Sequence, residues 1–271
     1  MTVGDNSHEV LPANWRVPTF DVPLWMGRKQ SHCVVIPVLN EGVRIKSLLR
    51  KMRDLDIPTI ADIIIVDGQS SDDSLGIKHV SAEGVVGLLV KTGSGKLSAQ
   101  LRCAYAFALE QGYEGIVTID GNDKDDPGAI QNFVDALKNG VDFVQGSRFI
   151  KGGGAENTPL LRHLAIRWIH APLIGLFSGF AWTDTTQGFR AYSRRLLLDH
   201  RIAPFRDVFV TYELLAYLSV RAPKLKFRCV ELPTTRRYPG GLVPTKIAGF
   251  RGNLAILLVL LRACCGGYDP E

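Results

Sequence analysis

The 271-residue sequence has no long apolar run, and its first residues do not combine basic charge with an apolar stretch. A membrane-spanning helix needs about 20 consecutive apolar residues, whereas the two most apolar segments, 173–182 and 254–261, are shorter. We therefore expect neither a transmembrane helix nor a secretory signal peptide. The two segments are expected to lie in the core, in the interface of a homo-oligomer or peripherally on a membrane surface.

Cysteine and histidine are too scattered to indicate a zinc-type metal centre. The five cysteines form no CxxC pair, and the six histidines lack the i,i+4 spacing of helical metal ligands. Free thiols predict a reducing, cytoplasmic compartment, which leaves open peripheral contact at the inner face of the membrane. The net charge of +5 suits an anionic partner, but no run of Lys and Arg indicates nucleic acid.

What the sequence does contain is an alternation of short apolar segments with segments of helical spacing. Apolar strands that alternate with amphipathic helices predict an α/β fold, with a mostly parallel sheet flanked by helices on both faces. The predicted strands are 33–38, 63–66, 85–90, 116–119 and 141–144.

Outside that alternation the predictions are coarser. Residues 1–30 contain several prolines and no periodicity, so we expect an irregular N-terminal arm. In the second half of the chain we expect three helices and one further strand. The helices are predicted at 160–177, 208–220 and 247–261, and the strand at 227–232.

Polar, acidic segments follow three of the predicted strands, at residues 40–42, 67–73 and 120–126. Each one alone is typical of a solvated loop that contains a capping Asp or Ser. Ligands of such sheets bind beyond the carboxyl ends of the parallel strands. Three such segments at one rim of the sheet therefore predict a binding site.

The segment 120–126 has the composition of a site for a hard cation. Asp120 and Asn122 lie two residues apart on a turn, so their oxygens can reach one ion. Oxygen ligands favour Mg²⁺ or Mn²⁺, and such an ion can bridge a diphosphate and offset the charge of a departing nucleotide. The turn is therefore predicted to bind a diphosphate through a metal ion held by Asp120 and Asn122.

Four ordered motifs resemble those of the family-2 glycosyltransferases. Residues 34–41 (VVIPVLNE) look like the first strand and turn of that family, and 65–74 (IVDGQSSDDS) like its second strand end. Residues 93–99 (GSGKLSA) resemble its glycine-lysine loop, and 118–122 (TIDGN) lie where it has a DXD motif. Later motifs resemble the dolichol-phosphate or polyprenyl-phosphate mannose synthase branch: 146–153, 184–192, 212–215 and 233–246.

The resemblance implies a GT-A fold, the nucleotide-diphospho-sugar transferase fold, with a catalytic domain over 31–246 and a C-terminal helix and tail over 247–271. It implies inverting transfer from a UDP- or GDP-linked sugar to a polyprenyl-phosphate-like or other membrane-associated acceptor. Asp120, Gly121 and Asn122 would hold the diphosphate and a Mg²⁺ or Mn²⁺ ion. Pro37, Leu39, Glu41 and Val66 would line the nucleoside pocket. The other donor-binding residues that it implies are Asp67, Arg148, Arg237 and Lys246.

The chain departs from the family pattern at several of these positions. Leu39 replaces the usual tyrosine, and Gly68 replaces the second of two paired aspartates. Asn122 replaces the last aspartate of the DXD motif, so we expect weak metal binding or partial substitution of the cation by Lys124. The arginine that precedes Lys246 is displaced, which makes Arg236 a candidate beside Arg237.

Transfer to a sugar hydroxyl by inversion needs a carboxylate base near the acceptor, and Asp184 and Glu213 are the candidates. Glu213 can instead be a buried carboxylate paired with Arg190. A lipid phosphate is already anionic and needs no base. Arg162 and Arg167, on an otherwise apolar helix, are then candidates to receive that phosphate, although a solvated helix face explains them as well.

Three other functions stay open. The same fold can transfer sugar to a soluble or glycan hydroxyl. A sugar-phosphate nucleotidyltransferase also combines an α/β sheet with an acidic metal site, but it needs a Gly-rich, basic loop after the first strand, where this chain has residues 38–41. A non-catalytic nucleotide-sugar binding protein would tolerate Asn122 and Gly68.

Overall fold

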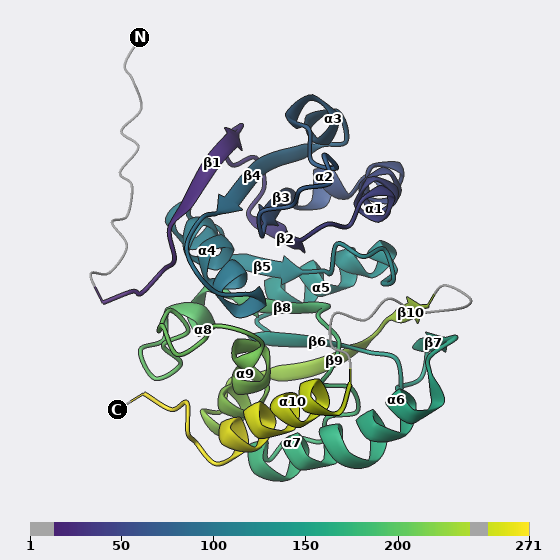
Figure 1. Ribbon diagram of the computed structural model, residues 1–271, viewed down its shortest axis with the longest axis vertical. Coiled ribbons are helices and arrows are strands. Elements are labelled where there is room, and N and C mark those ends of the chain that lie inside the picture. The colour runs from purple at the N-terminus through teal and green to yellow at the C-terminus, as the bar shows by residue number, and fades with distance from the viewer. Residues whose placement is uncertain (1–13, 239–248, 271) are drawn as a thin grey trace.

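The computed structural model describes residues 14–238 and 249–270, and a mixed eight-stranded sheet forms their centre (Figure 1). Six strands share one direction, whereas β1 and β8 run antiparallel to their neighbours. This confirms the predicted α/β fold. Across the sheet the strands are β1 (Phe20–Trp25), β4 (Val85–Lys91), β3 (Asp62–Asp67), β2 (His32–Val38), β5 (Gly115–Thr118), β8 (Arg190–Ser193), β6 (Phe143–Ser147) and β9 (Cys229–Pro233).

Helices cover both faces of this sheet and form two apolar clusters with it. Strands β2, β3 and β5 lie between the clusters and are almost wholly buried, which explains their uninterrupted apolar sequences. One face carries α1 (Val43–Asp54), α2 (Ile57–Ile60), α3 (Ile77–Ala82) and α5 (Ile130–Lys138). The other carries α4 (Leu97–Glu110), α7 (Ala171–Ser178), α9 (Glu213–Lys224) and α10 (Gly249–Cys264).

The predicted helix over 160–177 is divided into three parts. They are α6 (Leu160–Ala165), a π-helical turn (Ile166–His170) and α7. Pro172 explains the division, because it has no N–H to donate to a carbonyl of the preceding turn and its ring crowds that turn. Over the described ranges, none of the helices is both long and apolar enough to cross a bilayer.

The expected irregular arm is wrong for residues 20–25, which form β1. This strand pairs antiparallel with β4 at the edge of the sheet, and its register shifts between Asp21 and Leu24. An edge strand with such an irregularity tolerates Pro23, which cannot donate to a neighbour. The strand is held to the core through Trp25, whose ring lies 4.9 Å from that of Phe107 between centroids.

The helix predicted over 208–220 begins five residues later. Glu213 is the first residue of α9, and its carboxylate accepts the backbone N–H groups of Val210 and Thr211 at 2.9 and 2.6 Å. Those bonds hold the residues before Glu213 in a turn, so the helix cannot begin earlier. The short helix α8 (Arg194–Leu198) lies earlier in the same half.

Strand β8 was not predicted, and it sets the geometry of the site. It lies between β5 and β6 and runs against both, so its first residue, Arg190, is paired with Thr118 and with Gln145. The segment 183–189 therefore arrives at the carboxyl ends of β5 and β6. After β9 the chain also turns at this rim, into β10 (Thr235–Arg237), which pairs with β7 (Gly154–Glu156).

Candidate active site

The carboxyl ends of β2 and β3 bring together residues predicted to line the nucleoside pocket. Pro37 and Val66 are paired in the parallel register, as are Val38 and Asp67. Gln100 of α4 joins the two strand ends, because its side-chain nitrogen donates to the carbonyl oxygens of Val38 at 2.8 Å and Val66 at 2.6 Å. The floor of the predicted pocket is thus fixed by one buried amide.

The other predicted nucleoside residues follow these strand ends. Leu39 comes directly after β2 and is exposed, and the carboxylate of Glu41 is 2.7 Å from the guanidinium of Arg44. The carboxylate of Asp67 accepts the N–H and the hydroxyl of Ser70 at 2.6–3.0 Å. The Asp67 carboxylate thus stabilises the turn between residues 67 and 70, and these hydrogen bonds occupy acceptor positions that recognition of a base would need.

The predicted diphosphate turn follows β5 and packs against the end of β2. A Cβ atom at Gly121 would lie 3.1 Å from the carbonyl oxygen of Pro37, so the close approach favours glycine. The side chains of Asp120 and Asn122 lie side by side, with the Asn122 nitrogen 3.5 Å from Asp120 Oδ2. The Asn122 oxygen accepts the N–H of Lys124 at 3.2 Å.

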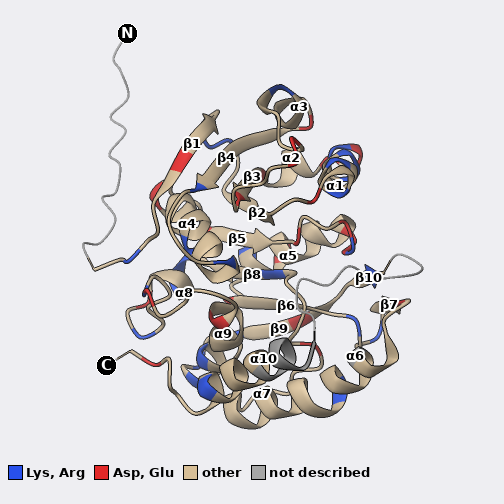
Figure 2. Cartoon of the chain, viewed as in Figure 1, with Lys and Arg blue, Asp and Glu red and all other residues tan. Residues whose placement is uncertain are grey.

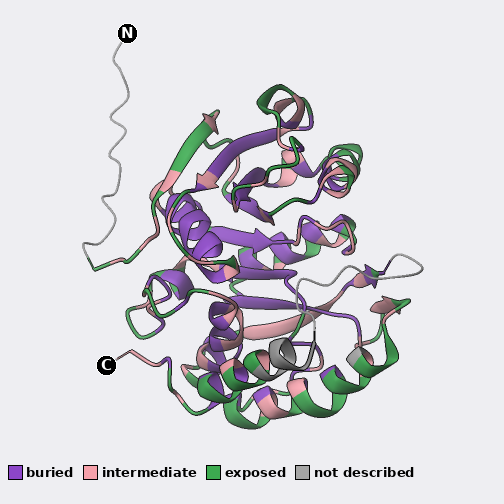
Figure 3. Cartoon of the chain, in the orientation of Figure 1, coloured by how far each residue is buried: buried purple, intermediate pink, exposed green. Residues whose placement is uncertain are grey.

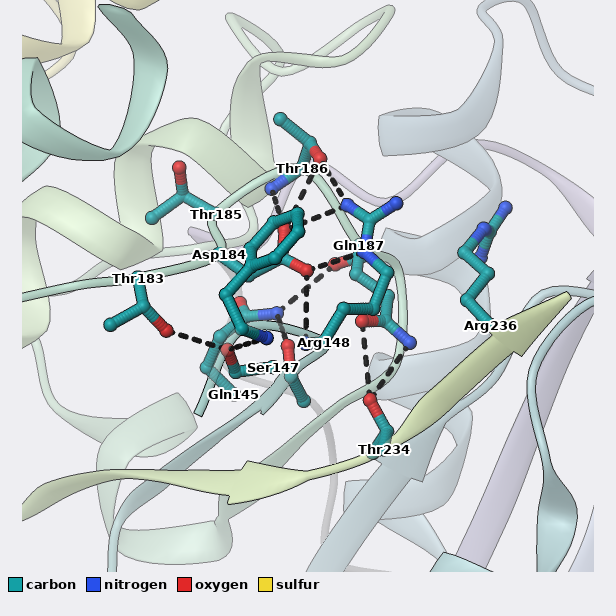
Figure 4. A network of polar contacts seen from close by, with 12 residues as sticks. Gln145, Ser147, Arg148, Thr183, Asp184, Thr185, Thr186, Gln187, Thr234 and Arg236 are labelled. Carbon is teal, nitrogen blue, oxygen red and sulfur yellow. Dashed lines mark hydrogen bonds and ion pairs between the residues drawn. The ribbon is translucent and has the colours of Figure 1, made fainter. Parts of the chain in front are cut away.

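A buried cation lies under this turn, and it is Arg236. Its guanidinium is 3.2 Å from Asp120 Oδ2 and 2.5 Å from Asp125 Oδ2. Asp125 is buried, which raises the pKa of its carboxyl, and it also accepts the side-chain N–H of Gln187 at 2.6 Å. Gln187 in turn contacts Thr234, as Figure 4 shows beside Arg236. Neither Asp125 nor Gln187 was predicted to belong to the site.

The prediction of Arg237 as a donor-binding residue is not supported by its position. Arg237 forms an exposed ion pair with Glu156 of β7. Neighbouring residues of a strand point to opposite sides, so only one of the two arginines of β10 can face Asp120. The structure places the guanidinium of Arg236 at Asp120, and the ammonium of Lys124 lies 5.0 Å from the ring centre of Tyr238. Lys246 lies outside the described residues.

Arg148 and Asp184 form a buried ion pair at the end of β6 (Figure 4). Two nitrogens of Arg148 donate to the two oxygens of Asp184 at 2.6 and 2.9 Å, and one of them also contacts Thr186 at 3.0 Å. Asp184 has no exposed surface. In this arrangement it positions Arg148 and is not placed to accept a proton from an acceptor, contrary to its predicted role as base.

The suggested ion pair of Glu213 with Arg190 is wrong. Glu213 accepts the N–H groups of Val210 and Thr211. The guanidinium of Arg190 donates to the carbonyl oxygens of Gln187, Leu215 and Thr185 at 2.6–2.9 Å. The carbonyls around the segment 183–189 are buried and need donors. Arg190 supplies them, so it fixes the segment that faces Asp120 and does not itself reach the surface.

The predicted ligands of a divalent ion are one carboxylate, from Asp120, and one amide oxygen, from Asn122, whereas the carboxylate of Asp123 in the same turn is paired with Lys51 at 2.8 Å. In the described part of the chain, no three His, Cys, Asp or Glu side chains are grouped closely enough to hold an ion by themselves. Mg²⁺ commonly binds through one or two protein oxygens together with substrate phosphates and water. The residues therefore fit an ion that is shared with a diphosphate.

Comparison with known proteins agrees with this geometry. Residues 33–201 match the model of glycosyl transferase family 2, and the chain belongs to that family. It is similar to the undecaprenyl-phosphate mannosyltransferase of Micrococcus luteus, with 27% identity over 243 residues, covering 86% of this chain and 98% of the relative. The polyprenol monophosphomannose synthase of Mycolicibacterium smegmatis is 26% identical over 212 residues, 76% of this chain and 77% of that protein. The protein is thus a hexosyltransferase-like enzyme.

Solved structures confirm the predicted GT-A fold. The glucosyl-3-phosphoglycerate synthase of Mycobacterium tuberculosis, crystallised with Mn²⁺, UDP-glucose and phosphoglyceric acid, superposes with a TM-score of 0.59 over 90% of this chain and 82% of that one. Its sequence identity is 19%, so the likeness is one of fold. Mannosyl-3-phosphoglycerate synthase from Rubrobacter xylanophilus gives a TM-score of 0.55 at 15% identity, over 86% and 72% of the two chains.

Replacing Gly188 by alanine should slow sugar transfer by about 10²-fold. A Cβ atom at this position would lie 2.3 Å from Asp120 Oδ1, so the carboxylate would have to move away from its present place. Initial rates with a saturating acceptor measure the effect. Gly76→Ala is the control, because a Cβ there meets nothing within 4 Å. Equal rates for both variants would mean that the position of Asp120 is unimportant.

Proposed function

We propose that this enzyme transfers a hexose, with inversion, from a UDP- or GDP-linked sugar to the phosphate of a polyprenyl-phosphate-like acceptor at a membrane surface. The observation that carries the proposal is the contact of the segment around the buried Arg148–Asp184 pair with an exposed apolar helical face, where His170 lies 2.8 Å from Thr185. The two polyprenyl-phosphate enzymes to which the chain is similar support the same acceptor class.

The donor half of the proposal rests on the rim of the sheet. The nucleoside would lie against the ends of β2 and β3, near Pro37, Leu39 and Val66, and its diphosphate at the Asp120 turn. Asp120 and Asn122 would hold a Mg²⁺ or Mn²⁺ ion there, and a bound ion supplies positive charge that favours departure of the nucleoside diphosphate. Arg236 adds a fixed positive charge at the same place.

The acceptor half rests on the surface of α6, the π-helical turn and α7. Figure 2 shows few charged residues on these helices, and Figure 3 shows much of their outer surface as exposed. A contiguous apolar face of this kind marks an interaction site on a soluble domain, and aromatic residues favour the membrane interface. The exposed apolar side chains include Leu160, Leu161, Trp168, Ile169, Leu176 and, on α10, Leu258.

A small pocket lies between this face and the residues that follow Arg148 and precede Asp184. Its volume is about 160 Å³, and Phe149, Arg167, Trp182 and Thr183 line it together with the first turn of α7. The guanidinium of Arg167 lies 5.8 Å from the ring centre of Phe149, the residue that follows Arg148. Arg167 can therefore meet an anionic headgroup while the neighbouring apolar side chains meet lipid. The side chain of Arg162 is not among those described.

The enclosure of both candidate bases also favours a phosphate acceptor. Asp184 is bound to Arg148, and Glu213 accepts the N–H groups of Val210 and Thr211. A sugar hydroxyl must lose a proton as it attacks, so transfer to a soluble or glycan hydroxyl needs an accessible base. A phosphate monoester is already ionised and needs none. The arrangement therefore supports the lipid phosphate over the hydroxyl acceptor.

The function is tested with radiolabelled UDP- and GDP-hexoses as donors and two kinds of acceptor. One reaction contains a polyprenyl phosphate in vesicles, and the other contains soluble sugars and phosphoglycerate, which offer hydroxyl groups. We expect label in the organic phase, in a product whose anomeric configuration is inverted. Label only in a soluble product would overturn the lipid acceptor. Pyrophosphate release from a nucleoside triphosphate would indicate a nucleotidyltransferase, and binding of donor without turnover would indicate a non-catalytic binding protein.

Substituting glutamate for both Leu161 and Trp168 should reduce flotation with anionic vesicles by at least about tenfold. Each of these side chains would bury apolar surface worth about 1.5–3 kcal/mol in the lipid interface, and the introduced charges would be repelled by anionic lipid. The control is Ile77→Glu on α3, which removes an exposed apolar side chain at the opposite end of the molecule (Figure 1). If the double variant floats as well as this control, the helical face does not bind the membrane.

A further inference from the structure

Arg236 holds two carboxylates that differ in how firmly they are fixed. Asp125 is buried, lies 2.5 Å from the guanidinium and is held on its other oxygen by Gln187. Backbone bonds on either side of Arg236 tie β10 to the same segment, from Asp126 N–H to Thr235 and from Arg237 N–H to Lys124. Arg236 is therefore held in place by Asp125 and by the backbone of residues 124–126.

Asp120 is the exchangeable partner of this triad. Its Oδ2 atom accepts hydrogen bonds from two nitrogens of Arg236, each at 3.2 Å, which is longer than the 2.5 Å contact of Asp125. A quarter of the Asp120 side-chain surface is exposed. Its Oδ1 atom faces Gly188, so closely that a Cβ atom added to Gly188 would lie 2.3 Å from this oxygen. A divalent ion that approaches from the open side must therefore compete with Arg236 for the same carboxylate.

We propose that Arg236 is an internal competitor of the divalent ion at Asp120, so that the turn binds a free ion weakly and binds it well only together with a nucleoside diphosphate. The proposal rests on the proposed function for the identity of that diphosphate. When the ion takes Asp120, Arg236 loses both of its hydrogen bonds to that carboxylate, while Nη1 keeps its acceptor, Asp125. Diphosphate oxygens can replace that acceptor, because guanidinium groups pair well with phosphate. A free ion brings no such replacement.

The affinity for free Mn²⁺, measured by electron paramagnetic resonance without nucleotide, tests the proposal apart from catalysis. We expect Arg236→Gln to bind Mn²⁺ at least about tenfold more tightly than the unmodified protein, because charge pairs at this distance are coupled by at least that factor. Arg237→Gln is the matched control, since it removes the same charge from the next residue of β10, and it should leave the affinity unchanged. Adding Asp120→Asn to Arg236→Gln should remove the gain.

A second variant guards against misfolding and against a general charge effect. Arg236→Gln leaves Asp125 buried without its cation, which is costly. The double variant Arg236→Gln/Asp125→Asn removes one charge of each sign, so the net charge of the protein does not change. It should show the same gain in Mn²⁺ affinity.

Three results would overturn the competition: unchanged Mn²⁺ affinity in the double variant, an equal gain in Arg237→Gln, or a gain that survives the loss of Asp120. Calorimetry with UDP and GDP on the same proteins reports separately on the donor. Failure of both nucleotides to bind would count against the proposed function, whereas the free-ion titration would still decide whether Arg236 competes.

Discussion

Asp120→Asn should lower kcat/KM for sugar transfer by about 10²–10³-fold, the loss that follows removal of one charged group that stabilises a transition state. Asp120 and Asn122 are the neighbouring ligands that the turn would offer to an ion, and Asp120 also faces Arg236. Without its charge, the site loses a ligand for the ion that the diphosphate would share. Initial rates over a range of donor concentrations measure the effect.

The stability of the Asp120→Asn variant should change little, because Arg236 keeps its closer and fully buried partner, Asp125. Asp126→Asn is the matched control within the same acidic segment. Asp126 is exposed and caps the turn at Pro127–Ala129, a task that asparagine also performs. Transfer by Asp120→Asn within threefold of this control would remove Asp120 from the proposed diphosphate site.

The second large effect concerns stability. Asp184→Asn should lower the free energy of unfolding by about 3–5 kcal/mol, because it leaves the guanidinium of Arg148 buried without a counter-charge. Both side chains of the pair are buried, and both oxygens of Asp184 accept from Arg148. Chemical denaturation followed by circular dichroism gives the change in free energy and shows whether the transition stays two-state.

The control for Asp184 is Asp199→Asn, which breaks a pair with Arg201 whose guanidinium is half exposed. Pairs of that kind contribute about 0–1 kcal/mol. If Asp184→Asn unfolds like the control but loses its transfer activity, Asp184 acts on the substrate and the assignment as a positioning residue is wrong.

The central sheet could be predicted because its strands are buried on both faces and therefore read as unbroken apolar runs. Strands β1 and β8 could not be predicted in the same way. The first is an edge strand interrupted at Pro23, and the second has only four residues, which begin with an arginine. Their pairing depends on the rest of the sheet, so no local pattern reveals it.

Some residues of the site could likewise be placed from the local sequence pattern, whereas others depend on contacts between distant segments. The grouping of Pro37, Val66 and Asp67 follows from the register of two parallel strands, which the sequence implies. The choice between Arg236 and Arg237 depends on which side of a three-residue strand faces the turn, and three residues carry too little periodicity to decide it. The partner of Arg148 depends on where β8 brings the segment before it.

The amide of Gln100, which joins the carbonyl oxygens of β2 and β3, also constrains any redesign of base selectivity. A Cβ atom at Gly68 would lie 3.3 Å from both the nitrogen and the oxygen of that amide. An aspartate introduced at residue 68 would therefore require the Gln100 amide to shift by a few tenths of an ångström, at the point where it joins the strand ends on which the nucleoside is proposed to rest. Residues 68 and 100 are in contact and should be varied together.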